Sequence, residues 1–314
     1  MQKFLPTNDL LFKKLLTSED SSSILKAFVK DLLGIEFQTL TPKETYHIDS
    51  YKKAFEEMDI LRTEVDILAI GEDGSHTTLE CQIQPHAYFR ERSIFYLAEA
   101  FCSPFGNLET NDFIRDNNFS ALRPAYGINI VDFHLFDQKQ DALQLFRLLN
   151  EQTNQPFLGT NRKELLLLCF LSLKNNNRKS QSAIHHWQHF LKTGETLANA
   201  PDYIKKAKQK VDYYSLGSEE KEMIMKINKS KAITDAVIST ARMEGIEEGI
   251  DLGIEQGIEQ GIEKGIDLGI EQGVEQEKRK FALRLIKMNL TIEQIVEATE
   301  LDLETIKKIE SEHK

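Results

Sequence analysis

Apolar and polar side chains alternate along two neighbouring segments, 63–70 and 75–84, as they do in the strands of a β-hairpin. The residues between them, Glu72-Asp73-Gly74, fit a three-residue turn whose glycine takes the left-handed conformation. Such a turn fixes the pairing of the two strands. It predicts that Asp66 lies directly opposite Glu80.

Most of the remaining chain shows helical periodicity, with apolar residues three and four positions apart. One such segment, 88–103, lies between the hairpin and the next strand, and this strand–helix–strand order predicts a right-handed crossover within a mixed or parallel sheet covered by helices. Its expected buried stripe is Phe89, Ile94, Phe95, Leu97, Ala98 and Phe101. The other expected elements are helices at 9–16, 23–33, 183–190 and 218–280, with Thr7 and Asn8 as candidate caps of the first, and strands at 126–136 and 165–173.

A glycine recurs at every fourth position within the last long helix, from Gly245 to Gly273. Each glycine costs a helix interior about 1 kcal/mol relative to alanine, and the acids that stand four apart repel one another. Small residues at this spacing let a second helix approach closely, so we interpret the repeat as a self-association surface. Because four residues overshoot one helical turn by about 40°, the stripe winds around the axis and favours a wrapped or crossed pairing. The alternative is an elongated, partly frayed linker.

The end of the chain is expected to form a small helical module with Thr291 and Asp302 as possible caps. A helix-turn-helix DNA reader is one interpretation. The near-neutral charge of this segment, with no basic second helix beyond Lys307 and Lys308, favours a protein-interaction cap instead. The expected helices are 282–289, 291–299 and 303–309.

The charge of the chain is unevenly distributed. The net charge is −11, yet residues 175–242 carry +5 and residues 243–277 carry −10. Overall acidity argues against nonspecific coating of nucleic acid, although the lysines between 205 and 210 leave room for a local basic groove. With three cysteines, no CxxC spacing, no leader-like N-terminus and no long apolar run, we expect a cytoplasmic protein that is neither exported nor inserted in a membrane.

Asp66 and Glu80 are the candidate chemical centre. Carboxylates facing each other across a hairpin repel, and a divalent cation such as Mg²⁺, which takes oxygen ligands, is the natural compensation. The alternative is a hairpin whose polar face is simply solvated. The position of Glu80 in mid-strand, inside an otherwise apolar stretch, is an unusual place for a solvated acid and favours a metal site.

The order of these motifs resembles a known family. Asp66 is followed after thirteen residues by Glu80-Cys81-Gln82, an upstream Asp9-x-x-Phe-Lys precedes the pair, and Arg92 and Tyr96 follow in the next helix. This arrangement is similar to that of the PD-(D/E)XK nuclease superfamily, and more closely to the Rpn group of recombination-promoting nucleases, described as PD-(D/E)XK nuclease family transposases. The glycine repeat and its short helical tail are also typical of that group.

The resemblance implies a Mg²⁺-dependent DNA endonuclease, with Mn²⁺ as a possible substitute. Asp66 and Glu80 would bind the metal together with the main-chain carbonyl of Cys81, and the metal would activate water and neutralise charge. Asp9 matches an acid that assists from the first helix, although an acid in a first turn is equally a partner of the helix dipole.

Gln82 is a departure, because the family pattern has lysine at this position. A glutamine can orient the attacking water but brings no positive charge, and members of the group carry glutamine there. Arg92 and Tyr96 are candidates for contacting phosphate or supporting the site, against a packing role. The histidines of the sequence HHWQH at 185–189 are expected to lie on a solvated helix rather than to bind zinc.

We therefore expect an α/β, restriction-endonuclease-like mixed sheet flanked by helices, followed by a long Gly-repeat helix and a small helical C-terminal module. The expected function is hydrolysis of DNA phosphodiester bonds in recombination, mobile-element biology or defence, by a protein that forms homo-oligomers. The alternative is a non-catalytic assembly protein that retains a nuclease fold. The expected parts are a nuclease-like domain at 1–195, a helical connector at 196–242, the repeat helix at 243–280 and the terminal module at 281–314.

Overall fold

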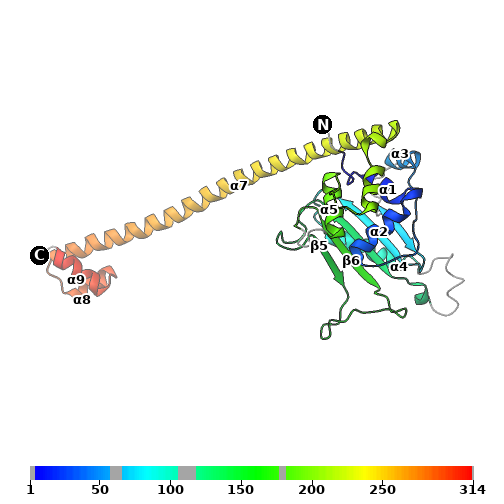
Figure 1. The fold of residues 1–314 in the computed structure, drawn as a ribbon. Helices are drawn as coiled ribbons and strands as arrows, with labels where there is room; N and C mark the ends of the chain where they lie inside the picture. The colour runs from blue at the N-terminus through cyan, green and yellow to red at the C-terminus, as the bar shows by residue number, and fades with distance from the viewer. Residues whose placement is uncertain (1–3, 57–65, 105–117, 177–181, 313–314) are drawn as a thin grey trace. The chain divides into compact units, whose positions relative to one another are not determined.

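A computed structural model describes residues 4–56, 66–104, 118–176 and 182–312 of the chain. The chain divides into two compact units, Met1–Lys229 and Ser230–Lys314. The first unit is built on a six-stranded sheet with helices on both faces (Figure 1). The expected four-part division of the sequence stays a prediction.

The sheet has the order β1-β2-β3-β4-β6-β5, with β3, β4 and β6 parallel and the other neighbours antiparallel, so it is mixed as predicted. Its strands are β1 (Leu40–Pro42), β2 (Ile67–Gly71), β3 (His76–Gln82), β4 (Ala125–Val131), β5 (Leu143–Arg147) and β6 (Leu166–Ser172). The helices of this unit are α1 (Asp9–Thr17), α2 (Ser22–Leu33), α3 (Ile48–Glu56), α4 (Phe89–Cys102), α5 (Ala183–Thr193) and α6 (Asp202–Lys210), followed by the start of α7 (Ser218–Lys287). The sequence patterns missed β1, β5 and α3.

The predicted hairpin is formed by β2 and β3. Gly71 and Ser75 close a three-residue turn, and Gly74 has φ of 77°, in the left-handed region that the turn requires. Ile67 pairs with Leu79, and continuing this register by one residue puts Asp66 opposite Glu80, as predicted. The first part of the predicted strand, 63–65, lies outside the described residues.

Both faces of the central strands are buried, because successive side chains enter two different cores. Ile128 and Ile130 of β4 join the larger core with α1, α2, α5 and α6, whereas Val131 joins the smaller core beneath α4. Leu79 likewise belongs to the larger core. The even-numbered residues of β3, Glu80 among them, therefore face α4 and not open solvent.

The buried stripe predicted for α4 is partly wrong. Phe89 and Leu97 are buried, but Ile94 and Phe95 are more than half exposed and Ala98 is exposed too. The buried face instead includes Ser93, Tyr96 and Ala100. The helix lies across β3, β4 and β6, and its orientation on these strands decides which of its faces is buried. The buried face carries polar and aromatic side chains toward the end of β3.

The second unit contains most of α7, together with α8 (Ile292–Thr299) and α9 (Leu303–Glu312). The predicted long helix is confirmed and ends later than expected, so 282–289 is mostly its last turns. Thr291 forms a capping box with Gln294, and Asp302 accepts the main-chain N–H of Thr305. In the part of the chain that the structure describes, no helix is both long enough and apolar enough to cross a bilayer.

Candidate active site

Asp66 and Glu80 approach each other at the point where β2 begins and β3 ends. Glu80 is 6% exposed beneath α4, and Asp66 is half-buried on the wall of the adjoining cleft. The main-chain N–H of Cys81 donates to the Asp66 carboxylate at 2.8 Å. The hairpin register and this hydrogen bond together hold the two carboxylates as neighbours.

Burial and neighbouring acids disfavour ionisation of both carboxylates. Burial, followed by the negative charge of Asp66, raises the pKa of Glu80 to about 8. Burial, followed by the charge of Asp9, raises the pKa of Asp66 to about 6, while the N–H of Cys81 opposes the rise. Carboxyl groups with raised pKa values in a cleft are typical of functional sites. Glu80 is therefore not on a solvated face, as the alternative interpretation of the hairpin would have it.

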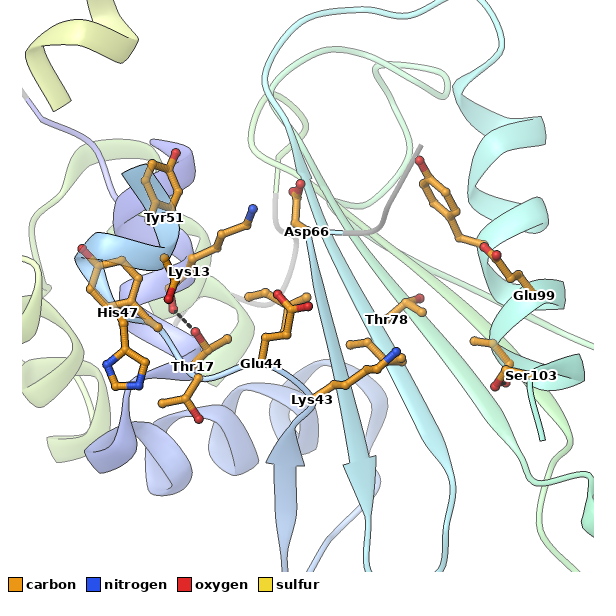
Figure 2. A pocket seen from close by; sticks show the side chains of 17 residues that line it. Lys13, Thr17, Lys43, Glu44, His47, Tyr51, Asp66, Thr78, Glu99 and Ser103 are labelled. Atoms are coloured by element: carbon orange, nitrogen blue, oxygen red, sulfur yellow. Dashed lines mark hydrogen bonds between the residues drawn. The ribbon is translucent and has the colours of Figure 1, made fainter. Parts of the chain in front are cut away.

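A cleft of about 390 Å³ opens beside Asp66. Lys13 on α1 points toward Asp66, Tyr51 lies on the same side of the cleft on α3, and Glu99 stands on α4 at the other side (Figure 2). Tyr96 also lines the cleft and is 5% exposed. The cleft therefore gives a ligand access to Asp66 between two groups of helices.

Gln82 and Arg92 meet next to Glu80. The Arg92 guanidinium donates from Nη2 to Gln82 Oε1 at 2.6 Å, and the same Nη2 lies 3.9 Å from Glu80 Oε2. Arg92 also lies over the ring of Tyr96, with 6.0 Å between guanidinium and ring centroid. Arg92 and Tyr96 were predicted to contact phosphate or support the site, and Arg92 lies next to Glu80 while Tyr96 lines the cleft.

A family model for PD-(D/E)XK nuclease family transposases matches residues 6–241. The chain belongs to this family. No curated protein and no solved structure matches the chain. The matched residues contain the whole sheet, the carboxylate pair and the start of α7.

The residues around the carboxylate pair suit a hard divalent cation. The pKa values of Asp66 and Glu80 are both raised although Arg92 and Lys13 are nearby, so a bound cation would supply charge that the pair still lacks. The main-chain oxygen of Gln82 accepts a hydrogen bond from the N–H of Asp132, just after β4, so the neighbouring Cys81 turns its N–H and C=O to the other side of the strand, toward β2 and Asp66. Within the described ranges, no three His, Cys, Asp or Glu side chains gather closely enough to hold a metal. The donors available are thus two carboxylates and a carbonyl, a set that suits Mg²⁺, which commonly retains several waters.

Asp9 is held near the carboxylate pair through a contact that the sequence did not predict. It is the first residue of α1, capped by Asn8, and its carboxylate accepts a hydrogen bond of 2.5 Å from the Tyr51 hydroxyl. Lys13, one turn later, places its ammonium 3.7 Å from Asp9. The charge of Asp9 acts on Asp66, so the first-helix acid lies near the pair as well as at a helix N-terminus.

Tyr51 and Lys13 are the site residues to which sequence reasoning assigned no role. Tyr51 is 9% exposed, and burial together with the charge of Asp9 raises its pKa. No motif marked it, because its partner is 42 positions away. Lys13 stood in the Asp9-x-x-Phe-Lys motif, and that signal could have identified it.

The prediction of a solvated helix for the histidine segment is wrong. His186, Trp187 and Gln188 are buried in α5, since this helix packs on α2 and α6 in the larger core. Burial, with His185 and His189 adding to it, lowers the pKa of His186, so the neutral form is favoured. These histidines are part of the fold, away from the carboxylate pair.

Proposed function

We propose that this protein is a Mg²⁺-dependent DNA endonuclease that hydrolyses phosphodiester bonds, with Mn²⁺ able to substitute. The observation that carries the proposal is the pair formed by Asp66, on the wall of a cleft, and the buried Glu80 next to it, in a chain of a nuclease family. A buried carboxylate pair is costly to the fold. A role in holding a cation on which a phosphate reacts gives a reason for keeping it.

The chain's own residues divide the work. Asp66, Glu80 and the carbonyl of Cys81 would hold the cation, which when bound lowers the pKa of a water and neutralises charge on the phosphate. The N–H of Cys81 fixes the rotamer of Asp66. Asp9, held by Tyr51, would assist from α1, and Arg92 and Tyr96 on α4 would face the phosphate.

The biological setting that we propose is recombination, mobile-element transfer or defence, in the cytoplasm. The family description as a transposase supports an activity on DNA that moves. All three cysteines are free, which agrees with a reducing compartment.

We further propose that the protein forms homo-oligomers through the repeat helix at 243–280. The isoleucines of the repeat, from Ile246 to Ile270, are all more than half exposed, a poor arrangement for a helix that stays alone in water. An added Cβ would meet nothing within 4 Å at any repeat glycine, so each leaves room for the backbone of a second helix.

A non-catalytic assembly protein is the second candidate. It is favoured by the amide of Gln82, which occupies the position of the family lysine and engages Arg92. A site without that lysine is consistent with a nuclease fold kept for binding alone.

Cleavage of plasmid and linear duplex DNA tests the proposal. We expect cleavage with Mg²⁺ or Mn²⁺ and none with EDTA, and a rate at least 100-fold lower for Asp66→Asn and Glu80→Gln, since each removes a charged metal ligand. Glu99→Gln is the matched control. It removes an exposed carboxylate from the other side of the same cleft and should retain the rate.

Two outcomes would decide against a nuclease. Wild-type protein that cleaves neither substrate with either metal would favour the assembly protein. Cleavage that survives both substitutions undiminished would mean that a contaminant is responsible.

A further inference from the structure

The orientation of the Gln82 amide is fixed at both ends. Its Nε2 donates to the main-chain oxygen of Gln84 at 2.9 Å, and its Oε1 accepts from Arg92 at 2.6 Å. Because arginine has only donors, the oxygen of the amide must be the atom that faces it. The side chain that replaces the family lysine is therefore engaged in holding an arginine.

Arg92 is held on several sides, and not all of its donors are satisfied. It packs over the rings of Phe89 and Tyr96, at 5.0 and 6.0 Å from guanidinium to ring centroid. Its Nε is buried and has no partner among the described residues. Its Nη2 lies 3.9 Å from Glu80, so the guanidinium is beside the carboxylate pair without forming a close bidentate pair with it.

Lys13 is the competing cation. Its ammonium is 3.7 Å from Asp9 and 5.7 Å from the ring centroid of Tyr51, and it lies on the Asp66 side of the cleft. Unlike Arg92, it has no contact with the residue that replaces the lysine. Two cations thus flank the pair, and only one of them is bound to Gln82.

We propose that Arg92 is the cationic residue of this site, donating to a non-bridging oxygen of the scissile phosphate, and that Gln82 is the positioning residue that holds it there. The inference rests on the proposed nuclease function and names the group that takes the place of the missing lysine. Guanidinium suits this task because its planar donors match two phosphate oxygens and it stays charged at every working pH. Arg92 accepts no proton and forms no covalent bond in the reaction. Its contribution is electrostatic.

The test is a rescue by the family residue. We expect Arg92→Ala to lower the single-turnover rate about 100- to 1000-fold, as loss of one transition-state donor does. Gln82→Lys introduced into Arg92→Ala should restore at least tenfold of that loss, because the lysine returns a cation to the same place. Gln82→Lys alone should be slower than wild type, since two cations then adjoin.

The positioning role of Gln82 is tested by a double-mutant cycle. Gln82→Ala should lower the rate about tenfold when Arg92 is present and have no further effect in Arg92→Ala, because the amide acts only through the arginine. Mn²⁺ affinity of each folded variant, measured by electron paramagnetic resonance, is the second readout. Loss of Arg92 removes a positive charge that repels Mn²⁺, so Mn²⁺ binding at pH 9 should be unchanged or tighter. A collapsed site would bind Mn²⁺ more weakly.

Separate results would overturn each statement. If wild type does not cleave DNA, the proposed function and this inference both fail. If wild type cleaves and Arg92→Ala is equally fast, or Gln82→Lys rescues Lys13→Ala and not Arg92→Ala, the function stands and the assignment of Arg92 fails. Arg92→Lys provides a check if Arg92→Ala does not fold, and it should retain more than a tenth of the rate.

Discussion

Glu80 is the residue at which function and stability conflict most directly. Its pKa in the folded protein, about 8, lies above the ordinary value of 4.5, because of burial and Asp66. The folded state therefore binds a proton that the unfolded state has lost between these pH values, and stability falls as pH rises through this window. One pKa unit corresponds to about 1.4 kcal/mol.

We predict that Glu80→Gln stabilises the protein in EDTA. At pH 8 the unfolding midpoint should rise by at least several degrees, since 1 kcal/mol corresponds to about 2–4 °C for a unit of this size. At pH 5, where Glu80 is protonated and resembles glutamine, the gain should largely disappear. Differential scanning fluorimetry at both pH values measures this, with Glu99→Gln as the exposed control. A gain of equal size at both pH values would contradict the pKa assignment.

Tyr51 offers a second test at a single atom. Tyr51→Phe removes the hydroxyl that donates to Asp9 and leaves the ring near Lys13 and Tyr46 in place. We expect a loss of about 1.5–3 kcal/mol in the free energy of unfolding, the usual contribution of a hydrogen bond to a charged group. DNA cleavage should slow by less than for Asp66→Asn, since Tyr51 acts through Asp9. Urea titration and single-turnover rates measure the two effects, and an unchanged urea midpoint would show that the bond contributes nothing.

At the scale of elements, the sequence predicted correctly the features that depend on residues close together in the chain. The hairpin register followed from a three-residue turn with Gly74, and the ends of α1 and α8 followed from capping residues. The failures at the site are long-range. The buried face of α4 depends on where it crosses β3, β4 and β6, and the link from Asp9 to Tyr51 joins helices with no shared pattern.

The same distinction separates the predicted part of the site from the rest. Asp66 and Glu80 could be paired from the sequence because one turn connects them. The guanidinium of Arg92 could be placed near them only as a candidate, because its contact with Gln82 depends on how α4 packs. Repeated patterns identified α7, whose exposed glycines reveal nothing locally about a partner.

The glycine repeat of α7 allows a substitution whose effect has opposite signs in a single chain and in an assembly. At Gly257 and Gly261 an added methyl meets nothing within 4 Å, so alanine should raise helix stability by about 1 kcal/mol per site. If a second helix approaches at these positions, the same methyls should hold it off and weaken self-association. We expect Gly257→Ala/Gly261→Ala to increase ellipticity and to dissociate more readily in sedimentation equilibrium. Gln256→Ala/Gln260→Ala is the matched control, and tighter association of the glycine variant would exclude close helix packing.

At the scale of the whole molecule, the root of α7 belongs to the first unit. Glu220 is 9% exposed and its two carboxylate oxygens each accept from Lys14 Nζ at 2.7 Å, while Tyr46 donates to it at 3.0 Å. Met223 and Ile224 enter the larger core from the same turns. These residues tie the long helix to α1 and to the segment that lines the cleft.

Two truncated chains, one with and one without these first turns of α7, should therefore differ in stability. A chain ending at Thr240 keeps every contact of Glu220, so it should unfold within about 2 °C of the first transition of the full chain, because 1 kcal/mol corresponds to 2–4 °C. It should also keep DNA cleavage and sediment as a monomer. A chain ending at Leu216 leaves Lys14 without its partner, and breaking a buried ion pair from one side costs about 3–5 kcal/mol, so it should melt much lower or fail to fold. Equal stability of the two chains would show that the first turns of α7 do not contribute to the stability of the first unit. An unchanged oligomer in the chain ending at Thr240 would place self-association outside the repeat helix.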